Sequence, residues 1–287
     1  MKTAAIVILY YPPESVIENI LSYSRDVQFL VVVDNSLECN DYIPNRLRCV
    51  VNTEYFHMPE NIGMAASLNI GAEVALQHGC THLLTMDQDS RFMDGDFLIY
   101  LQRSRSLFVT SVAMTVPLHL YRKVRKKDDG RSREISLAMT SGSILNLNAY
   151  KDCGRFDESF FIDHVDHEYC LRLRSRGWKL WEVREVLLRH CLGNVNKARI
   201  FFFFQKEYIS HSPERGYYNL RNGLQVLKKY KGVRGVEHVR FSLLADILKS
   251  VFFEAEKRKR IYFFLKAAVD FRQEKFGKLS TLTLRVD

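Results

Sequence analysis

Two carboxylates one residue apart follow the apolar run His82–Met86. They are Asp87 and Asp89, with Gln88 between them. Because side chains alternate along an extended chain, both carboxylates are expected on the same side of a strand. Two carboxylates aimed at one point repel each other unless a cation or a basic group lies between them, and a hard divalent ion such as Mg²⁺ or Mn²⁺ takes oxygen ligands of this kind. Aspartate and serine are also common turn residues, so a polar turn after a buried strand is the alternative.

A second group of polar residues lies between Asp157 and Gly177, where acidic residues and histidines stand beside aromatic residues. From Val165 the apolar spacing is helical, and Gly177 marks the end of the expected helix. Asp166 would lie in the first turn, where the helix dipole favours an ionised carboxylate. Helix capping is the common alternative for an acid at this position, so the spacing alone leaves its role open.

The elements that would position these residues alternate between strand and helix. The expected strands are Ala5–Tyr10, Phe29–Val33, Cys49–Val51 and His82–Met86, and the expected helices are Glu14–Ser24 and Gly63–His78. This order predicts a parallel sheet, whose ligands bind at the carboxyl ends of the strands. Asp34 and the pair Asp87/Asp89 both fall at such ends, and this agreement favours a ligand site over a polar turn.

Length and composition fit one large α/β domain with a helical appendage. The 287 residues are 47% hydrophobic and 26% charged, an ordinary globular balance. The six cysteines form no Cys-x-x-Cys pair and no zinc-type cluster with histidine, so we expect reduced thiols in a cytosolic protein. The apolar segment 4–11 is interpreted as a first strand and not as a signal peptide, and no stretch approaches the length of a membrane span.

Charge is distributed unevenly along the chain. From Val195 to Asp287 there are 20 Lys/Arg and 9 Asp/Glu, a net charge of +11. The residues before Val195 contain 22 Lys/Arg and 24 Asp/Glu, a net charge of −2. Such a basic tail suggests a polyanionic partner, either nucleic acid or an anionic membrane surface. No nucleic-acid recognition motif accompanies the charge, so we do not expect a nucleic-acid partner.

The tail itself predicts amphipathic helices. Apolar residues from Val236 to Phe252 recur at helical spacing, the basic run Lys257–Arg260 follows, and Tyr262–Leu265 is aromatic and apolar. These helices suit docking on an anionic membrane face, and they suit packing on the α/β domain equally well. We expect packed helices with a basic outer edge, and we divide the chain into a main domain, residues 1–225, and an extension, residues 226–287.

Several motifs, in their order and spacing, resemble those of bacterial family 2 glycosyltransferases of the GT-A fold, and more closely those of O-antigen and cell-wall rhamnosyltransferases. The likeness covers roughly residues 4 to 225. Its motifs are Tyr10-Tyr11-Pro12, Val33-Asp34-Asn35-Ser36, Asn61-Ile62-Gly63, Asn69-Ile70-Gly71, Asp87-Gln88-Asp89, Ser141-Gly142-Ser143, Phe160-Phe161-Ile162-Asp163 with Val165-Asp166, Glu168 and Cys170-Leu171-Arg172, and His190-x-x-Gly193. One departure is Val165-Asp166, where many family 2 enzymes have Glu-Asp; the rhamnosyltransferase-like branch commonly has Val-Asp.

The resemblance implies a fold and an activity. The fold would be α/β, a Rossmann-like mixed sheet flanked by helices, with a C-terminal helical extension. The activity would be inverting transfer of L-rhamnose from dTDP-L-rhamnose to a hydroxyl of a growing, polyprenyl-linked cell-surface polysaccharide, at the inner face of the cytoplasmic membrane. UDP-galactofuranose or another UDP-hexose is the alternative donor, and a nucleic-acid-binding or scaffold protein is the alternative of another class.

The resemblance also implies roles for single residues. Asp166 would be the general base that accepts the proton of the acceptor hydroxyl. Donor contacts would come from Tyr10, Tyr11, Asp34, Asn61, Gly63, Asp87 and Asp89, with Asp34 accepting the imide N–H of uracil or thymine. Acceptor contacts would come from Gly142, Asp163 and Glu168. A divalent Mg²⁺ or Mn²⁺ would be held by Asp89, Asp87 and His190, although a purely structural role for His190 is an equal alternative.

Overall fold

The computed structural model describes residues 1–38, 41–47, 52–108, 111–120, 130–190, 195–200, 204–209 and 211–280, with the backbone alone for the two segments between 195 and 209. The chain divides into two compact units. The first comprises Met1–Glu158 and Asp166–Cys191, and the second comprises Ser159–Val165 and Leu192–Asp287. The polypeptide therefore passes from the first unit to the second and back again before it enters the C-terminal helices.

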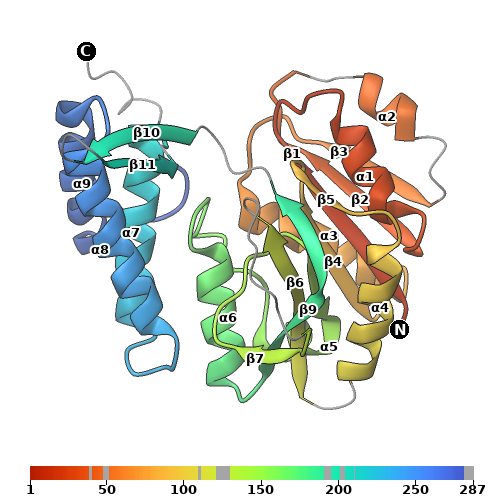
Figure 1. The fold of residues 1–287 in the computed structure, drawn as a ribbon. Coiled ribbons are helices and arrows are strands. Elements are labelled where there is room, and N and C mark those ends of the chain that lie inside the picture. Colours follow the sequence, from red (N-terminus) through yellow and green to blue (C-terminus); the bar gives the residue numbers. More distant parts are fainter. Residues whose placement is uncertain are drawn as a thin grey trace. The chain divides into compact units, whose positions relative to one another are not determined.

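The first unit contains the sheet and the helices around it (Figure 1). In chain order its elements are β1 (Thr3–Leu9), α1 (Val16–Ser24), β2 (Phe29–Asp34), α2 (Tyr42–Leu47), β3 (Thr53–His57), α3 (Met64–Gln77), β4 (His82–Asp87), β5 (Ser90–Phe92), α4 (Asp96–Leu107), β6 (Val112–Leu120), β7 (Arg133–Ile135), β8 (Ser143–Asn146), α5 (Leu147–Cys153), α6 (Val165–Ser175) and β9 (Lys179–His190).

The sheet is mixed, in the order β3-β2-β1-β4-β8-β6-β9-β5, with β7 also paired to β9. The strands β3, β2, β1 and β4 run parallel, as the alternation of strands and helices predicts. The strand β8 is antiparallel to β4 and to β6, while β9 is parallel to β6 and pairs antiparallel with β5. The predicted mixed α/β sheet is thus confirmed.

The pairing brings the ends of β2 and β4 to one edge of the sheet. Leu9 is in register with Asp34 on one side of β1, and Ile8 is in register with Asp87 on the other side. Both acids therefore end strands that flank β1, and the predicted position of the two acids at one carboxyl edge is confirmed.

Burial explains why these segments form a central sheet. Residues 29–34 of β2 are buried throughout, which is typical of a parallel strand covered on both faces. The predicted helix 63–78 is confirmed as α3, and it lies close to β1: a Cβ at Gly71 would come within 2.3 Å of Ile6 Cδ1. The predicted strand Cys49–Val51 lies outside the described residues, and the third strand of the described chain is β3.

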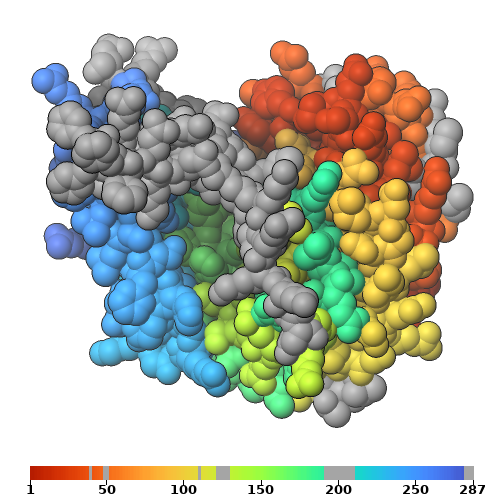
Figure 2. Space-filling view, in the orientation of Figure 1, coloured from red at the N-terminus to blue at the C-terminus, as the bar shows by residue number. Residues whose placement is uncertain are grey.

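The second unit is a hairpin and a group of helices. Its elements are β10 (Val195–Ile200), β11 (Phe204–Ile209), α7 (Pro213–Lys229), α8 (Val236–Phe252) and α9 (Lys257–Arg272). The hairpin strands are antiparallel, and α7 packs against both α8 and α9. Figure 2 shows the helices of this unit in blue, in space-filling form.

The start of α7 has the features of a regular helix N-terminus. Pro213 stands at its first position, and the Ser212 hydroxyl caps it by accepting a hydrogen bond from the Arg215 N–H at 3.2 Å. The whole of α7 belongs to the second unit, so the predicted boundary between residues 225 and 226 would fall inside this helix. No helix of the described chain is both long enough and apolar enough to cross a membrane.

Candidate active site

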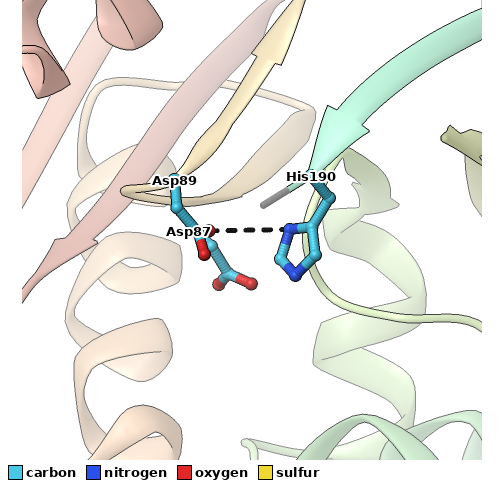
Figure 3. Close-up of side chains that lie close together, drawn as sticks. All are labelled: Asp87, Asp89 and His190. Carbon is cyan, nitrogen blue, oxygen red and sulfur yellow. Dashed lines mark ion pairs between the residues drawn. The ribbon is translucent and has the colours of Figure 1, made fainter. Parts of the chain in front are cut away.

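Three side chains from three separate strand ends meet at the carboxyl edge of the sheet (Figure 3). Asp87 ends β4, Asp89 precedes β5, and His190 ends β9. Each offers a ligand atom, and these atoms all lie within 4.8 Å of one another. The His190 Nδ1 is 3.6 Å from an Asp89 carboxylate oxygen, and Asp89 is open to solvent whereas His190 is largely buried.

Strand pairing explains how His190 reaches a pair of acids far earlier in the chain. The short strand β5 is antiparallel to β9, with Ser90 directly in register with His190. The chain between Asp87 and Ser90 therefore turns at Asp89 and enters the pairing that holds the histidine. The structure thus brings together the three residues that the sequence assigns to a metal ion, and metal binding by them stays a prediction.

Buried hydroxyl groups hold the histidine ring. A hydrogen bond of 2.6 Å joins Ser90 Oγ to His190 Nδ1, and the Ser141 hydroxyl donates to Ser90 Oγ at 2.7 Å. His119 Nε2 lies 2.7 Å from the Ser141 carbonyl oxygen. Sequence reasoning assigned no such role to the two serines or to His119, because Ser90 meets His190 through the pairing of β5 with β9, and His119 comes near it through the pairing of β6 with β9.

The electrostatic surroundings favour a neutral imidazole at this edge. Burial lowers the pKa of His190, and the negative charge of Asp89 opposes this shift in part. Burial also lowers the pKa of His119, and nearby His190 lowers it further. The hydrogen bond to Ser141 and the negative charge of Asp166 both act in the opposite direction. A neutral imidazole is the form that ligates a metal ion, so the low pKa of His190 fits that role.

The donor set fits a divalent cation. Two carboxylates brought this close repel each other unless a positive charge lies between them. Two oxygen ligands and one imidazole suit Mn²⁺ or Mg²⁺, and three protein ligands leave positions open for substrate oxygens. The grouping of Asp87, Asp89 and His190 is therefore a candidate metal centre.

Gln88 fixes the loop between the two aspartates, a role that sequence reasoning missed. Its Oε1 accepts a hydrogen bond from the Tyr10 N–H at 2.8 Å, and its Nε2 donates to the Tyr10 carbonyl at 3.2 Å. The Asn19 amide also donates to the Gln88 carbonyl at 2.8 Å. The Gln88 side chain thereby connects the loop of the two aspartates to the backbone at the end of β1 by hydrogen bonds.

The two tyrosines predicted to contact the donor base stand at the surface. Tyr10 and Tyr11 are 49% and 52% exposed, and their rings meet edge to face at a centroid distance of 4.7 Å. Tyr11 has a φ of +44°, and its N–H donates to the Ser36 hydroxyl at 2.7 Å. A flat ligand can stack on such rings, so base stacking by the two tyrosines stays a prediction.

Asp34 differs from its expected setting. Its side chain is fully buried, one oxygen accepts the Tyr55 hydroxyl at 2.5 Å, and the other accepts the Ser36 N–H at 2.9 Å. Both oxygens therefore already have partners inside the protein, and a nucleotide base would have to compete with Tyr55 or with the Ser36 N–H for them. The described contacts give Asp34 a structural role in shaping the loop after β2, and base recognition stays a prediction.

Asn61 and Gly63 form the entry to α3. The Asn61 side chain accepts the Gly63 N–H at 2.9 Å, and Gly63 has a φ of +85°, which favours glycine. Asn35 accepts the Ile62 N–H at 3.3 Å and binds Ser67 at 3.0 Å. The loop is thus fixed between β2 and α3, and donor binding by Asn61 and Gly63 stays a prediction.

Asp166 lies in the first turn of α6, as the sequence predicts. It is half-buried, and its Oδ1 accepts the N–H of His167 at 2.8 Å. Asp166 belongs to the same unit as the metal-binding candidates, and its charge acts on His119, which in turn is influenced by His190. His119 therefore lies within electrostatic range of both the candidate base and the candidate metal centre.

The three residues predicted to bind the acceptor all have partners inside the protein. Gly142 has a φ of +78°, and an added Cβ would come within 2.7 Å of Leu188 and 2.8 Å of Pro117. Asp163 lies in the second unit and binds Arg215 through two oxygens at 3.1 to 3.3 Å. Glu168 is 1% exposed and forms an ion pair with Arg172. These contacts are structural, and acceptor binding by the three residues stays a prediction.

No family model matches the chain. In sequence it is similar to the dTDP-rhamnosyl transferase RfbF of Shigella flexneri, with 24% identity over 242 residues that cover 78% of this chain and 79% of RfbF. The resemblance to rhamnosyltransferases that the motifs indicate is therefore confirmed.

Solved structures of glycosyltransferases share the fold. The 1–349 structure of TarS from S. aureus matches with a TM-score of 0.57 and 13% identity, over 94% of this chain and 81% of TarS 1–349. A longer TarS structure matches with a TM-score of 0.54 and 16% identity. The match covers 95% of this chain and 49% of the longer TarS chain, so this chain spans about half the length of that TarS structure. The structure of GalNAc-T7 with UDP, GalNAc and Mn²⁺ matches with a TM-score of 0.57 and 11% identity, over 96% of this chain and 58% of the GalNAc-T7 chain. The predicted GT-A fold is confirmed.

Proposed function

We propose that this chain, a glycosyltransferase of the GT-A fold, transfers L-rhamnose from dTDP-L-rhamnose to a hydroxyl of a growing cell-surface polysaccharide, with inversion at the anomeric carbon. The observation that carries the proposal is the meeting of Asp87, Asp89 and His190 at the carboxyl edge of the sheet. The likeness to a dTDP-rhamnosyl transferase supports the choice of a hexosyltransferase reaction and of this donor.

The donor side of the reaction uses the three clustered side chains. A divalent ion held there would neutralise the charge that develops on the leaving nucleoside diphosphate. Asp89, the more exposed acid, faces the solvent from which the donor arrives, whereas Asp87 and His190 are more enclosed. Ser90 and Ser141 keep the His190 ring in one orientation, and Gln88 keeps the loop of Asp87 and Asp89 on β1.

The acceptor side needs a group that takes up a proton. Asp166 is the carboxylate that we assign to this step: it accepts the proton of the attacking hydroxyl while the oxygen bonds to the anomeric carbon and the bond to the diphosphate breaks. Direct displacement of this kind inverts the anomeric centre. Asp166 lies in the first turn of α6, and its Oδ1 accepts the N–H of His167 at 2.8 Å.

The acceptor that we propose is a polyprenyl-linked O-antigen or cell-wall glycan at the cytoplasmic face of the membrane. The support comes from the sequence relative, a dTDP-rhamnosyl transferase, and from the basic tail, in which 20 Lys/Arg stand against 9 Asp/Glu from Val195 onward. A lipid-linked acceptor requires an enzyme that works at a membrane surface, and an anionic surface attracts a basic one.

A donor screen tests the proposal. Purified protein is incubated with dTDP-L-rhamnose, UDP-galactofuranose, UDP-glucose or UDP-N-acetylglucosamine, with Mn²⁺, with Mg²⁺ or with EDTA, and the released nucleoside diphosphate is measured. We expect release from dTDP-L-rhamnose that EDTA abolishes. Release from none of the donors under any condition would contradict the assignment as a sugar transferase.

The general base is tested separately. We expect Asp166→Asn to bind the nucleotide as the wild type does and to lose transfer by about 1000-fold, within the range that general base catalysis contributes. His167→Asn, a change at the adjacent position, serves as the matched control and should retain transfer. Near-normal turnover of Asp166→Asn would reject Asp166 as the base.

A UDP-hexose donor is the second candidate. The observation that favours it is the similarity to solved structures that contain UDP, one of TarS 1–349 and one of GalNAc-T7. The same donor screen distinguishes the two candidates, because nucleotide release from a single UDP-sugar would replace dTDP-L-rhamnose without changing the roles of the clustered side chains.

A further inference from the structure

The outer sides of α8 and α9 expose large apolar side chains. Of the seventeen large hydrophobic side chains that are exposed in the described part of the chain, ten lie between Phe241 and Val269. Phe241, Leu265 and Phe252 are 68%, 65% and 64% exposed. Large apolar side chains concentrated in this way on two helices point to a surface that binds a partner.

These side chains form regular faces on both helices. On α8 they recur as Phe241, Leu244, Leu248 and Phe252, at spacings of three or four residues. The opposite side of α8 carries the buried residues Val236, Val239 and Leu243. Each apolar set follows the helix period, so α8 has one apolar face in the core of the unit and a second one in water.

The helix α9 repeats this arrangement. Ile261, Leu265 and Val269 are four residues apart and exposed, while Phe263 and Ala267 are buried against the rest of the unit. Gly216 of α7 lies against Phe264, where an added Cβ would come within 3.2 Å of the ring. The inner faces of the helices are thus already filled, and their outer faces remain for another partner.

The charge around these faces identifies the partner. Residues 211–280 contain 16 Lys/Arg and 7 Asp/Glu, a net of +9. Arg260 is buried in an ion pair with Glu254 at 2.6 Å, which leaves Lys257, Arg258 and Lys259 at the surface just before Ile261. Lysine is depleted in the apolar centre of protein interfaces, whereas lysine and arginine beside exposed aromatic and aliphatic residues are typical of helices that lie on lipid.

We infer that the outer faces of α8 and α9 form a membrane-docking surface, with the apolar side chains in the headgroup region of an anionic bilayer and the basic side chains on lipid phosphates. This inference rests on the proposed function in one respect, because the proposed acceptor is lipid-linked. The surface itself is inferred from the exposure of the apolar side chains and from the charge around them. The sequence predicts packed helices with a basic outer edge. The structure adds exposed apolar side chains on the same helices, and packing alone does not explain why these side chains are exposed.

Vesicle flotation tests the surface. Full-length protein is mixed with vesicles of phosphatidylcholine alone or with phosphatidylglycerol, at low and high salt. We expect binding to phosphatidylglycerol vesicles and an at least tenfold loss in the double variant Leu248→Glu, Leu265→Glu. The matched control is Leu98→Glu, Ile99→Glu on α4, where the side chains are 50% and 45% exposed, and it should bind as the wild type does.

Three results would overturn the inference. The wild type could fail to float with anionic vesicles, or the Leu248/Leu265 variant could bind as tightly as the wild type. Analytical ultracentrifugation could also show a dimer that this variant abolishes, which would assign the faces to a second copy of the chain. Nucleotide release from dTDP-L-rhamnose, measured on the same preparations without vesicles, reports separately whether the proposed transferase function itself fails.

Discussion

Asp89 is the side chain on which the donor chemistry depends most directly. It is the exposed member of the three-residue cluster, and it pairs with His190 at 3.6 Å. We expect Asp89→Asn to lower metal-dependent nucleotide release about 100-fold, because one charged oxygen ligand is lost where negative charge must be neutralised. Release measured over a Mn²⁺ titration checks this.

The matched control for Asp89 is Asp94→Asn. Asp94 is an exposed acid in the short segment between β5 and α4, so its replacement makes the same change in net charge outside the three-residue cluster. The control should release nucleotide as the wild type does. An equal loss in both variants would mean that net charge, and not a ligand at position 89, explains the effect.

Ser90 acts on the same centre through the histidine ring. Its hydroxyl is fully buried and bonds to His190 Nδ1 at 2.6 Å, so its removal frees the ring to rotate. We expect Ser90→Ala to weaken Mn²⁺ binding about 10- to 100-fold, the usual effect of losing a group that orients a metal ligand. Electron paramagnetic resonance of Mn²⁺ measures this without any need for turnover.

The control for Ser90 is Ser104→Ala. Ser104 is also fully buried, and its hydroxyl bonds to Thr115 Oγ1 at 2.8 Å. Ser104→Ala loses this one buried hydrogen bond and Ser90→Ala loses two, so we expect losses of unfolding free energy of about 1 and about 2 kcal/mol. If Ser104→Ala weakens Mn²⁺ binding as much as Ser90→Ala does, general loss of stability and not the position of the ring explains the effect.

Among the secondary-structure elements, the turn into β8 leaves no room for a side chain at Gly142. Gly142 has a φ of +78°, and an added Cβ would meet Leu188 at 2.7 Å and Pro117 at 2.8 Å. We expect Gly142→Ala to lower the unfolding free energy by about 2–4 kcal/mol, from backbone strain together with overpacking. Gly95→Ala separates the two causes, because Gly95 has a φ of +81° and nothing within 4 Å of its added Cβ. Equal losses in chemical denaturation would show that overpacking adds nothing.

The first residue of β4 links stability to pH. Burial lowers the pKa of His82 to about 4, while the unfolded chain keeps an ordinary value near 6.5. Above about pH 6.5 both states are neutral; as the pH falls toward 4 the unfolded state takes up the proton first, so stability falls by up to about 3 kcal/mol. Denaturation of wild type and His82→Gln at several pH values checks this, and an equal pH slope in both would contradict it.

The strands β1, β2 and β4 and the helices α1 and α3 were predictable, because the strands are largely apolar and the helices have a clear period, whereas β3 (TEYFH) and α2 carry no such signal and were not predicted. Alternation along a strand predicted that Asp87 and Asp89 lie on one side of the same strand, and this was wrong: β4 ends at Asp87, and Asp89 lies in the turn before β5. The antiparallel half carries weaker signals: β5 has three residues, and its pairing with β9 depends on the order of the whole sheet. For that reason the hydrogen bond of Ser90 to His190, and that of Ser141 to Ser90, could not be deduced from sequence.

Glu168 shows the opposite case, in which a local signal was available. It stands four residues before Arg172, the spacing at which a helix brings a carboxylate and a guanidinium together. The structure buries this ion pair, with Arg172 Nε donating to Glu168 Oε1 at 3.1 Å. The motif resemblance alone pointed Glu168 toward the acceptor, and the helical spacing would have indicated the ion pair.

In the molecule as a whole, the chain leaves the sheet unit for residues 159–165 and returns directly into α6. The second unit holds this segment through α7: Phe161 stacks on Tyr218 at a centroid distance of 5.4 Å, and Asp163 binds Arg215. The residue after the segment is Asp166, the candidate base. The helix α7, which is distant in sequence, therefore holds the segment that directly precedes the candidate base.

Asn222 is the side chain that tests this long-range support. It is fully buried on α7, and its amide donates to the carbonyl oxygens of Ile162 at 2.8 Å and Asp163 at 3.2 Å. Asn222→Ala leaves both carbonyls without this donor and should lower the unfolding free energy by about 1–3 kcal/mol. We also expect at least tenfold slower sugar transfer, while the affinity for the nucleoside diphosphate stays within about twofold, because the proposed donor contacts lie in the first unit.

The matched control is Lys228→Ala on the same helix, where the side chain is exposed and pairs with Glu274 at 3.0 Å. Surface ion pairs of this kind contribute little, so both stability and transfer should stay close to those of the wild type. If Asn222→Ala loses stability but transfers sugar at the wild-type rate, α7 supports only the fold of the second unit. Slower transfer with unchanged nucleotide affinity would instead mean that the helical unit positions the base through the chain that enters α6.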